Sequence, residues 1–204
     1  MQVLKEYHIK EIVNIWKNKN IIIYPTDTLY GFLGDATSIK VINKIIKIKK
    51  RPINKPFLVL INENLLKNFY FPKNFNFLLI YKVTIITKSY DKTLNKIFKE
   101  IFNTSKIGFR IPKKYFLLKA INKFNKPIVA PSANISGKEP IKHLREAKKF
   151  FEKNVKFFVQ GKISKKPSSI LEIIDKNTLK ILRKGEDFEK ILSDCIKRGI
   201  KIQR

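Results

Sequence analysis

Apolar residues follow two different periods along this chain, and the two periods alternate. Short apolar runs rich in β-branched residues, typical of buried strands, cover 21–24, 57–61, 83–87, 107–111, 128–130, 157–159, 169–174 and 179–182. Apolar residues spaced three and four apart, typical of amphipathic helices, cover 4–16, 38–49, 65–69, 94–102, 113–124, 141–151 and about 188–198. Strands and helices that interleave in this way predict an α/β fold.

Prolines and one serine set the boundaries of several predicted elements. Pro25 ends the first strand, and Pro52 and Pro56 make a loop after the second helix. Pro112 ends the strand predicted at 107–111. Ser38 is suited to cap the second helix. The 204 residues contain no internal repeat, linker or low-complexity tail. We therefore predict a single domain over residues 1–204.

The charge balance is strongly basic and allows two interpretations. Lysine and arginine number 44 against 16 acidic residues, a formal net charge of +28. A functional interpretation is a polyanionic partner, RNA first, because counterion release favours binding to such a surface. The alternative is a drift of surface positions toward Lys, Asn and Ile under an AT-rich genome. The sequence leaves both interpretations open.

One cysteine and two histidines limit disulfide and metal chemistry. Cys195 stands at a core-like position, which predicts a buried thiol. His8 and His143 have no partners at metal-ligand spacing, so we expect no metal site built from protein side chains. The N-terminus has no signal-peptide pattern, and no apolar run reaches membrane-spanning length. We therefore expect a cytoplasmic protein with no membrane partner.

Three segments place hydroxyl, small or cationic residues beside an apolar run or a predicted helix. They cover 24–31, 49–52 and 132–137. Loops that follow strands are where α/β proteins bind phosphorylated ligands. Together the segments predict a nucleotide pocket.

The chain has no GxxxxGK[ST], GxGxxG or GxSxG motif, which excludes the P-loop, the dinucleotide fingerprint and the nucleophile elbow. Cationic and hydroxyl groups suit electrostatic stabilisation of phosphoryl or nucleotidyl transfer.

Two arginines are the best candidates for anion binding. Arg51 stands between a helix end and a proline, and its guanidinium suits bidentate phosphate binding. Lys49 beside it is also explained by the favourable position of a cation at a helix C-terminus. Arg110 lies within a short apolar strand. Its side chain either faces solvent or points into a pocket and holds a substrate carboxylate, and position alone does not decide between the two.

Six segments in this order resemble the YrdC/TsaC threonylcarbamoyl-AMP synthases. They are YPTDTLYG at 24–31, KKRPINKP at 49–56, FRIP at 109–112, APSANISG at 130–137, PSSILE at 167–172 and ILRKG at 181–185. The resemblance implies a single-domain twisted mixed sheet with flanking helices and an open concave face, with core motifs from about 21 to 185. It also implies the formation of threonylcarbamoyl-AMP and pyrophosphate from L-threonine, bicarbonate and ATP, for threonylcarbamoyladenosine modification of tRNA.

The resemblance also implies roles for individual residues. Threonine would be bound by Thr28, Arg110, Ala130 and Ser169, with Ser168 as the alternative to Ser169. ATP would be bound by Lys49, Arg51, Lys55, Ser132, Asn134 and Arg183. Catalysis, through charge neutralisation, would rest on Lys49, Arg51 and Arg110. No dedicated general base is expected. After Arg183 we expect one short helix.

Cofactor and partners follow from the same resemblance. Mg²⁺ would accompany ATP, the basic face would contact tRNA or other RNA, and the product would pass to a threonylcarbamoyl transferase complex. An alternative function is a non-catalytic protein of the same fold that binds tRNA or double-stranded RNA. A third is a module acting on another carbamoyl-adenylate, as in hydrogenase-maturation proteins. Those are much longer chains with zinc-finger-like cysteine motifs, which this chain lacks.

Overall fold

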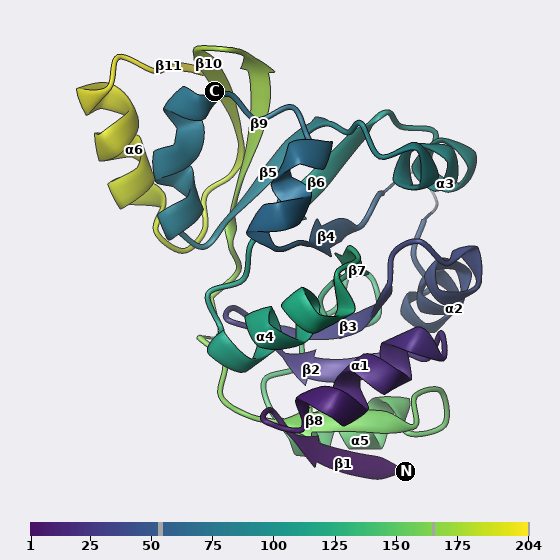
Figure 1. The fold of residues 1–204 in the computed structure, drawn as a ribbon. Coiled ribbons are helices and arrows are strands. Elements are labelled where there is room, and N and C mark those ends of the chain that lie inside the picture. The colour runs from purple at the N-terminus through teal and green to yellow at the C-terminus, as the bar shows by residue number, and fades with distance from the viewer. Residues whose placement is uncertain (53–54, 165, 204) are drawn as a thin grey trace.

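A computed structural model describes residues 1–52, 55–164 and 166–203 of the chain. Its strands form one sheet of eleven in the order β1-β8-β2-β3-β7-β4-β6-β5-β9-β10-β11 (Figure 1). The strands are β1 (Gln2–Lys5), β2 (Ile22–Pro25), β3 (Tyr30–Asp35), β4 (Leu58–Leu60), β5 (Val83–Lys88), β6 (Lys106–Arg110), β7 (Ile128–Val129), β8 (Phe157–Gln160), β9 (Ser169–Asp175), β10 (Thr178–Arg183) and β11 (Lys201–Gln203). The helices are α1 (Ile9–Lys17), α2 (Ile39–Lys49), α3 (Lys92–Phe102), α4 (Tyr115–Phe124), α5 (Leu144–Phe151) and α6 (Phe188–Lys197), with 3₁₀ helices η1 (Glu63–Asn68) and η2 (Lys73–Ile80).

The sheet is mixed, as predicted. Parallel pairs are β1–β8, β2–β8, β4–β6, β5–β9 and β10–β11. Antiparallel pairs are β2–β3, β3–β7, β4–β7, β5–β6 and β9–β10. Helices flank the sheet, so the predicted α/β class is confirmed.

Two apolar cores lie against the sheet. One core packs α1 and α4 against the first half of the sheet, where Trp16 and Phe124 meet edge to face with ring centroids 5.6 Å apart. The helices α1 and α4 run beside each other over β2 and β3 (Figure 1). The larger core includes the buried faces of α2, α3, α5 and α6. Cys195 lies in this core as a buried free thiol, as predicted.

Helix cover differs between the two halves of the sheet. Strands β2 and β3 are buried at every position, because apolar groups pack on both of their faces. In β9 buried and half-buried residues alternate over the first five positions. One row of side chains therefore remains partly open, and the strand register brings Leu58, Gly108, Ile86 and Ile170 into it. This open face borders the helix-covered half.

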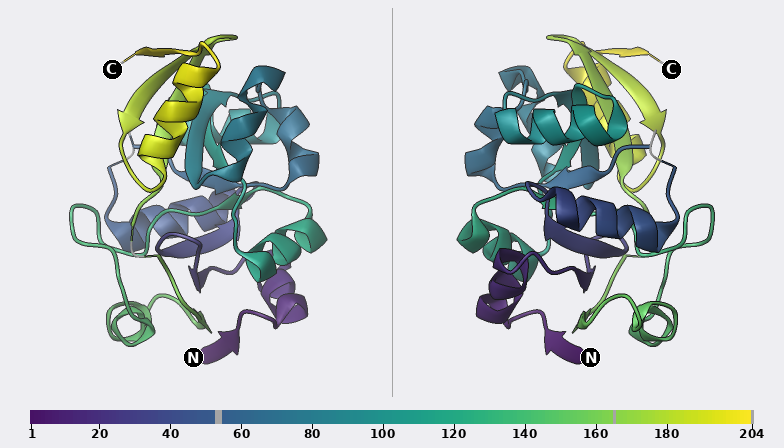
Figure 2. Two further views of the ribbon diagram at one scale, coloured as in Figure 1. Left: turned by 90° about the vertical axis from the view of Figure 1, so that its left-hand side faces the viewer. Right: turned by 90° about the vertical axis from the view of Figure 1, so that its right-hand side faces the viewer.

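A crossing segment connects the two halves after β8. It comprises residues 161–164 and 166–168 of the described chain. It leads to β9, which is separated from β8 by six strands in the sheet order. Figures 1 and 2 show this connection rising from the N-terminal half toward the C-terminal half. It therefore passes the boundary where helix cover ends.

The structure corrects several predicted elements. The helix predicted from residue 4 begins at Ile9, because Leu4 belongs to edge strand β1, paired with β8. The predicted loop through Gly31 ends earlier, and β3 begins at Tyr30. This strand has the sequence YGFLGD, without β-branched residues, and hairpin pairing with β2 supports it. The helix predicted at 65–69 is the 3₁₀ helix η1.

Two further details differ at element ends. Ser38 occupies the N-cap position of α2, but its side chain makes no capping hydrogen bond. The tail after Arg183 contains α6 and also β11, which pairs in parallel with β10. Three residues are too few to give a periodic signal, so β11 depends on its neighbour for definition.

Candidate functional site

A cavity of about 230 Å³ lies where the helix-covered half of the sheet meets the open half. Its polar lining comes from seven separate segments of the chain. These lining residues are Thr26, Thr28, Arg51, Thr84, Arg110, Ser132, Ser168 and Arg183. Three of them are arginines, and no acidic residue lines the cavity among the described residues. The cavity therefore suits a ligand with more than one negative charge.

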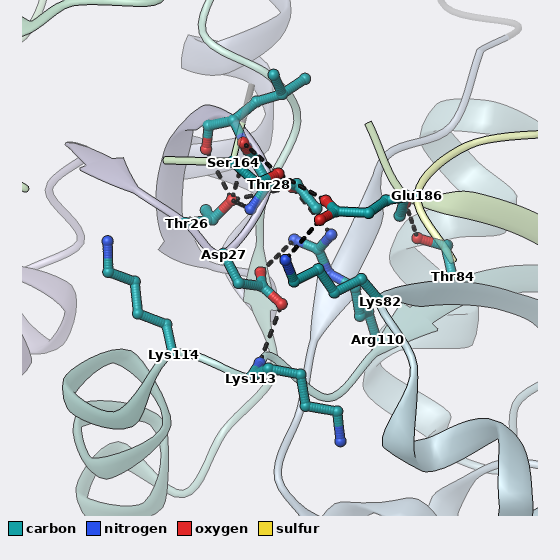
Figure 3. Close-up of polar contacts among 12 residues, drawn as sticks. Thr26, Asp27, Thr28, Lys82, Thr84, Arg110, Lys113, Lys114, Ser164 and Glu186 are labelled. Atoms are coloured by element: carbon teal, nitrogen blue, oxygen red, sulfur yellow. Dashed lines mark hydrogen bonds and ion pairs between the residues drawn. The ribbon is translucent and has the colours of Figure 1, made fainter. Parts of the chain in front are cut away.

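Arg110 forms one end of the cavity, at the C-terminal end of β6. It is 3% exposed, and its Nη1 donates to Thr28 Oγ1 at 3.0 Å. Its Nη2 lies 3.2 Å from Asp27 Oδ1, in an ion pair that is almost fully buried (Figure 3). Within the described part of the chain the buried Nε has no hydrogen-bond partner. Arg110 therefore keeps donor capacity that a bound carboxylate would fill.

The turn that carries Asp27 and Thr28 is fixed by its own hydrogen bonds. Thr26 Oγ1 accepts from the backbone N–H groups of Thr28 and Leu29, and it donates to the Leu29 carbonyl at 2.7 Å. Asp27 Oδ2 accepts from the backbone N–H of Lys113 at 3.0 Å. The local bonds of Thr26 and the long-range bond of Asp27 together hold Thr28 toward Arg110.

Arg51 and Arg183 line the rest of the cavity. Arg51 donates to the backbone carbonyls of Lys55 and Pro56 and lies 5.1 Å from the Phe57 ring centroid. Burial lowers the pKa of the Arg51 guanidinium. Partial burial of the Arg183 guanidinium against Ser168, and then the charge of Arg110, lower the pKa of Arg183. The effect of Arg110 on Arg183 indicates that these two cations lie close to each other at the cavity.

Lys49 lies beneath the loop at 132–138. It is 1% exposed, and its ammonium donates to Ser132 O at 2.6 Å and to Asn134 O and Oδ1 at 2.9 Å each. Three acceptors use all three of its donors. Burial, and then the nearby charge of Arg51, lower the pKa of Lys49 to about 7. Ser132 Oγ also donates to Asn134 Oδ1 at 2.7 Å, so this oxygen accepts from both Lys49 and Ser132 and links them within the loop.

The two serines before and at the start of β9 face different surroundings. Ser168 lines the cavity, shares a 2.9 Å hydrogen bond with Thr84 Oγ1, and accepts at its carbonyl from Arg183. Ser169 is fully buried, and its Oγ donates to Glu186 O and accepts from Gly185 N. The structure therefore places Ser168 at the cavity and turns Ser169 away from it.

The cavity floor is apolar around Gly108. Leu58 on β4 and Ile86 on β5 pair with Gly108, and Ile170 lies one strand further along, on β9. A Cβ added at Gly108 would lie 3.4 Å from Ile86 Cγ1 and Thr84 Cγ2, so the glycine leaves a level surface between larger side chains. Such a surface suits an aromatic ring.

The structure brings together six of the ten residues proposed from the sequence. Those that line the cavity are Thr28, Arg51, Arg110, Ala130, Ser132 and Arg183. Lys49 and Asn134 support the loop from below, Ser169 faces the protein interior, and Lys55 is exposed outside the lining. Residues 53 and 54 of the cationic loop motif lie outside the described residues.

Other polar residues near the site had not been identified from the sequence. Glu186 accepts from Lys82 Nζ at 2.7 Å and from Ser164 Oγ at 2.6 Å, close to Thr28 (Figure 3). No motif marks these three residues, because they come from distant segments and meet only in the folded chain.

In the described residues no group of three or more His, Cys, Asp or Glu side chains could hold a metal ion. None of the described helices has both the length and the hydropathy needed to cross a bilayer.

Comparison with known proteins agrees with this fold. The Sua5/YciO/YrdC family model, described as Telomere recombination, matches residues 14–185. A threonylcarbamoyl-AMP synthase from Wigglesworthia glossinidia brevipalpis is 30% identical over 202 residues, covering 89% of this chain and 96% of that protein. One from Buchnera aphidicola subsp. Acyrthosiphon pisum is 30% identical over 177 residues, covering 78% and 94%.

Solved structures share the fold at lower sequence identity. P. abyssi Sua5 complexed with L-threonine has a TM-score of 0.86 at 20% identity, and the match covers 100% of this chain. This chain spans 63% of that protein. E. coli YciO has a TM-score of 0.77 at 21% identity, covering 90% of this chain and 95% of that one. With the family match over residues 14–185, the chain belongs to the Sua5/YciO/YrdC family.

Proposed function

We propose that this protein is a threonylcarbamoyl-AMP synthase, a nucleotidyltransferase that makes threonylcarbamoyl-AMP and pyrophosphate from L-threonine, bicarbonate and ATP. The observation that carries the proposal is the meeting of Arg110, Arg51 and Arg183 around one cavity. Relatives named threonylcarbamoyl-AMP synthase and a structural neighbour complexed with L-threonine support the choice of substrate.

Arg110 is the proposed binding group for the threonine carboxylate. Its Nε has no partner in the described residues, and this leaves a donor for a carboxylate at the cavity. Asp27 and Thr28 hold the guanidinium in place. A carboxylate that accepts from a buried guanidinium forms a strong, charge-assisted contact. Thr28 and Ala130 would line the same subsite, and Ser168 takes the place first given to Ser169.

ATP would occupy the remainder of the cavity. Its phosphates would lie between Arg51, Arg183 and the Ser132 loop, and its adenine would lie on the apolar floor around Gly108. Lys49 and Asn134 would act by shaping that loop. The described residues contain no cluster of acidic or imidazole ligands, so Mg²⁺ would be held mainly by the ATP phosphates, beside the Ser132 hydroxyl.

The proposed chemistry needs alignment and charge neutralisation. The threonine amine and bicarbonate form a carbamate with loss of water, a carbamate oxygen attacks the α-phosphorus of ATP, and pyrophosphate leaves. Carbamate and triphosphate are both anions that repel each other. Arg51, Arg110 and Arg183 would hold the two substrates together and offset this repulsion.

The product would be used by a tRNA-modifying step. We propose that a threonylcarbamoyl transferase takes the product and that tRNA contacts the basic surface, consistent with the net charge of +28. If so, tRNA affinity falls steeply as salt rises, because bound counterions are released on association. A flat salt dependence would argue that the charge is compositional drift.

Pyrophosphate release tests the reaction directly. The protein is incubated with ATP, bicarbonate and Mg²⁺, with and without L-threonine, and with L-serine as the comparison. We expect release that depends on threonine and is weaker with serine. A folded sample that releases no pyrophosphate above the background would reject the synthase proposal and favour an RNA-binding role.

A further inference from the structure

The crossing segment, residues 161–164 and 166–168, forms one wall of the cavity through Pro167 and Ser168. At its start the chain packs closely against the N-terminal half. A Cβ added at Gly161 would lie 2.6 Å from the Glu6 carboxyl carbon and 2.8 Å from Pro25 Cγ, and Gly161 O accepts from Tyr30 Oη at 2.9 Å. This end of the segment is therefore fixed by close backbone packing.

The other end packs against the chain after β10. A Cβ added at Gly185 would lie 2.4 Å from Ser168 O and 2.5 Å from Pro167 O, and Glu186 N donates to Pro167 O at 2.8 Å. Arg183 donates twice to Ser168 O. Backbone atoms of the crossing segment therefore hold both of its ends. A side-chain substitution in the middle of the segment leaves these contacts intact.

The middle of the segment is held by a side chain instead. Ser164 Oγ lies 2.6 Å from Glu186 Oε2, and the other carboxylate oxygen of Glu186 accepts from Lys82 Nζ at 2.7 Å. The Glu186 side chain is 19% exposed, and that of Lys82 is 27% exposed. Figure 3 shows this group beside Thr28 and Arg110. Ser164 Oγ lies 3.5 Å from Thr28 O.

We propose that Glu186 is a positioning residue for the amino-acid substrate. It accepts the Ser164 hydroxyl proton and so holds the middle of the crossing segment beside the turn that presents Thr28 to Arg110, with Ser164 Oγ 3.5 Å from Thr28 O. This inference rests on the proposed function, because it names the same subsite as the threonine site. Glu186 itself is outside the cavity lining and acts through Ser164 and Thr28.

The arrangement predicts an effect on one substrate only. The hydroxyl–carboxylate contact at 2.6 Å is charge-assisted, and such contacts are stronger than neutral ones. Without it, the middle of the crossing segment is no longer held beside Thr28, so the packing around the threonine subsite loosens. Arg51 and Ser132 have separate supports in Pro56 and Lys49. The ATP phosphate contacts there should change little.

The test compares Glu186→Ala and Ser164→Ala with Glu172→Ala. Glu172 also pairs with a lysine, Lys106, in the same half of the sheet, but it is outside the cavity lining. We expect the first two variants to raise the KM for threonine about tenfold, with less than a twofold change in the KM for ATP. Their effects should not add in the double variant, because they break one contact. Glu172→Ala should change neither KM.

A charge-reversed pair provides the rescue. In Lys82→Glu/Glu186→Lys the ion pair is reversed and the new ammonium can donate to Ser164 Oγ, so the threonine KM should return to within threefold of wild type. Equal increases in both KM values, or full additivity of Glu186→Ala and Ser164→Ala, would overturn the proposed role.

Hydrogen exchange gives a readout that needs no activity. Amides of the peptide over 161–168 should exchange faster in Glu186→Ala and Ser164→Ala than in wild type, and Glu172→Ala should leave them unchanged. Unchanged exchange in the first two variants would overturn the positioning role. A wild-type protein that shows no threonine-dependent pyrophosphate release would instead overturn the proposed function, while the exchange result would still report on the contact.

Discussion

The loop around Lys49 and the cavity end around Arg110 are both built on a buried cation, but the two cations are paired differently. Lys49 is 1% exposed, and three loop oxygens accept all of its donors. Arg110 is 3% exposed, and it has one hydrogen bond, one ion pair and a buried Nε without a partner in the described residues. A fully paired cation organises protein, whereas an incompletely paired one has donors left for a ligand.

This difference in pairing distinguishes a residue that supports a loop, Lys49, from a residue that is available to bind a ligand, Arg110. Sequence motifs mark both residues equally, since each lies among conspicuous segments of the chain. Only the count of partners shows that Lys49 shapes the Ser132 loop and that Arg110 faces the cavity. Substitutions at the two positions should therefore damage different properties of the protein.

The largest effect on activity should come from Arg110→Ala. Removing the guanidinium takes away the proposed carboxylate contact. We expect kcat/KM for threonine to fall about 30-fold to 150-fold, since about 2–3 kcal/mol of charge-assisted binding is lost. Pyrophosphate release measures this, and circular dichroism checks that the fold is intact. ATP should still raise the melting temperature. Turnover at the wild-type rate would remove Arg110 from the site.

The largest effect on stability should come from Lys49→Met. The substitution takes the ammonium donor from the buried oxygens Ser132 O, Asn134 O and Asn134 Oδ1, of which the last keeps only Ser132 Oγ. The free energy of unfolding should therefore fall by about 3 kcal/mol. Urea unfolding measures it. Lys47→Met is the matched control, because Lys47 is exposed on the same helix turn. If both variants unfold alike, Lys49 does not anchor the loop.

The pKa of Lys49 predicts a dependence of stability on pH. The pKa is about 7 in the folded protein against 10.5 for a free lysine, so between these values the unfolded chain binds more protons. The free energy of unfolding should then rise with pH, by up to about 1.4 kcal/mol per pH unit. Burial raises the pKa of Cys195 from 9.0 to about 11, which opposes this trend above pH 9.

The useful window for that measurement is therefore pH 7 to 9. Urea unfolding at several pH values should show the rise in wild type and a smaller slope in Lys49→Met. Lys113 also has its pKa lowered, chiefly by burial, and it contributes with the same sign in both proteins. An identical slope in the two proteins would assign the pH dependence to groups other than Lys49.

The smallest effects should separate the two adjacent serines. Ser168→Ala removes a hydroxyl from the cavity wall, and kcat/KM should fall about fivefold to tenfold with little change in stability. Ser169→Ala leaves Gly185 N and Glu186 O without a partner, and unfolding free energy should fall by about 1–2 kcal/mol with activity within twofold of wild type. The reverse pattern would return the substrate contact to Ser169.

Much of the fold could be predicted where the sequence repeats a period for long enough. The helices α2, α3 and α4 have buried faces at regular spacing, and their predicted ranges lie within two residues of the structure at each end. Strands β5, β6 and β10 were predicted equally closely. The failures were β1, β3 and β11, which are short or have unusual composition. Partner strands define them, and local propensity does not.

The sequence alone determined the residues available for chemistry and the α/β class, because composition, motifs and periodicity are properties of the chain itself. The tertiary structure decided which of those residues share a cavity. Strand order places β3, β7, β4, β6, β5 and β9 side by side, and this assembles Thr28, Ser132 and Arg110 from distant segments. It also decided that Lys49 is buried beneath a loop, that Ser168 rather than Ser169 lines the cavity, and that Glu186 meets Ser164. Contacts between distant segments depend on how the whole chain packs, and no local pattern encodes them.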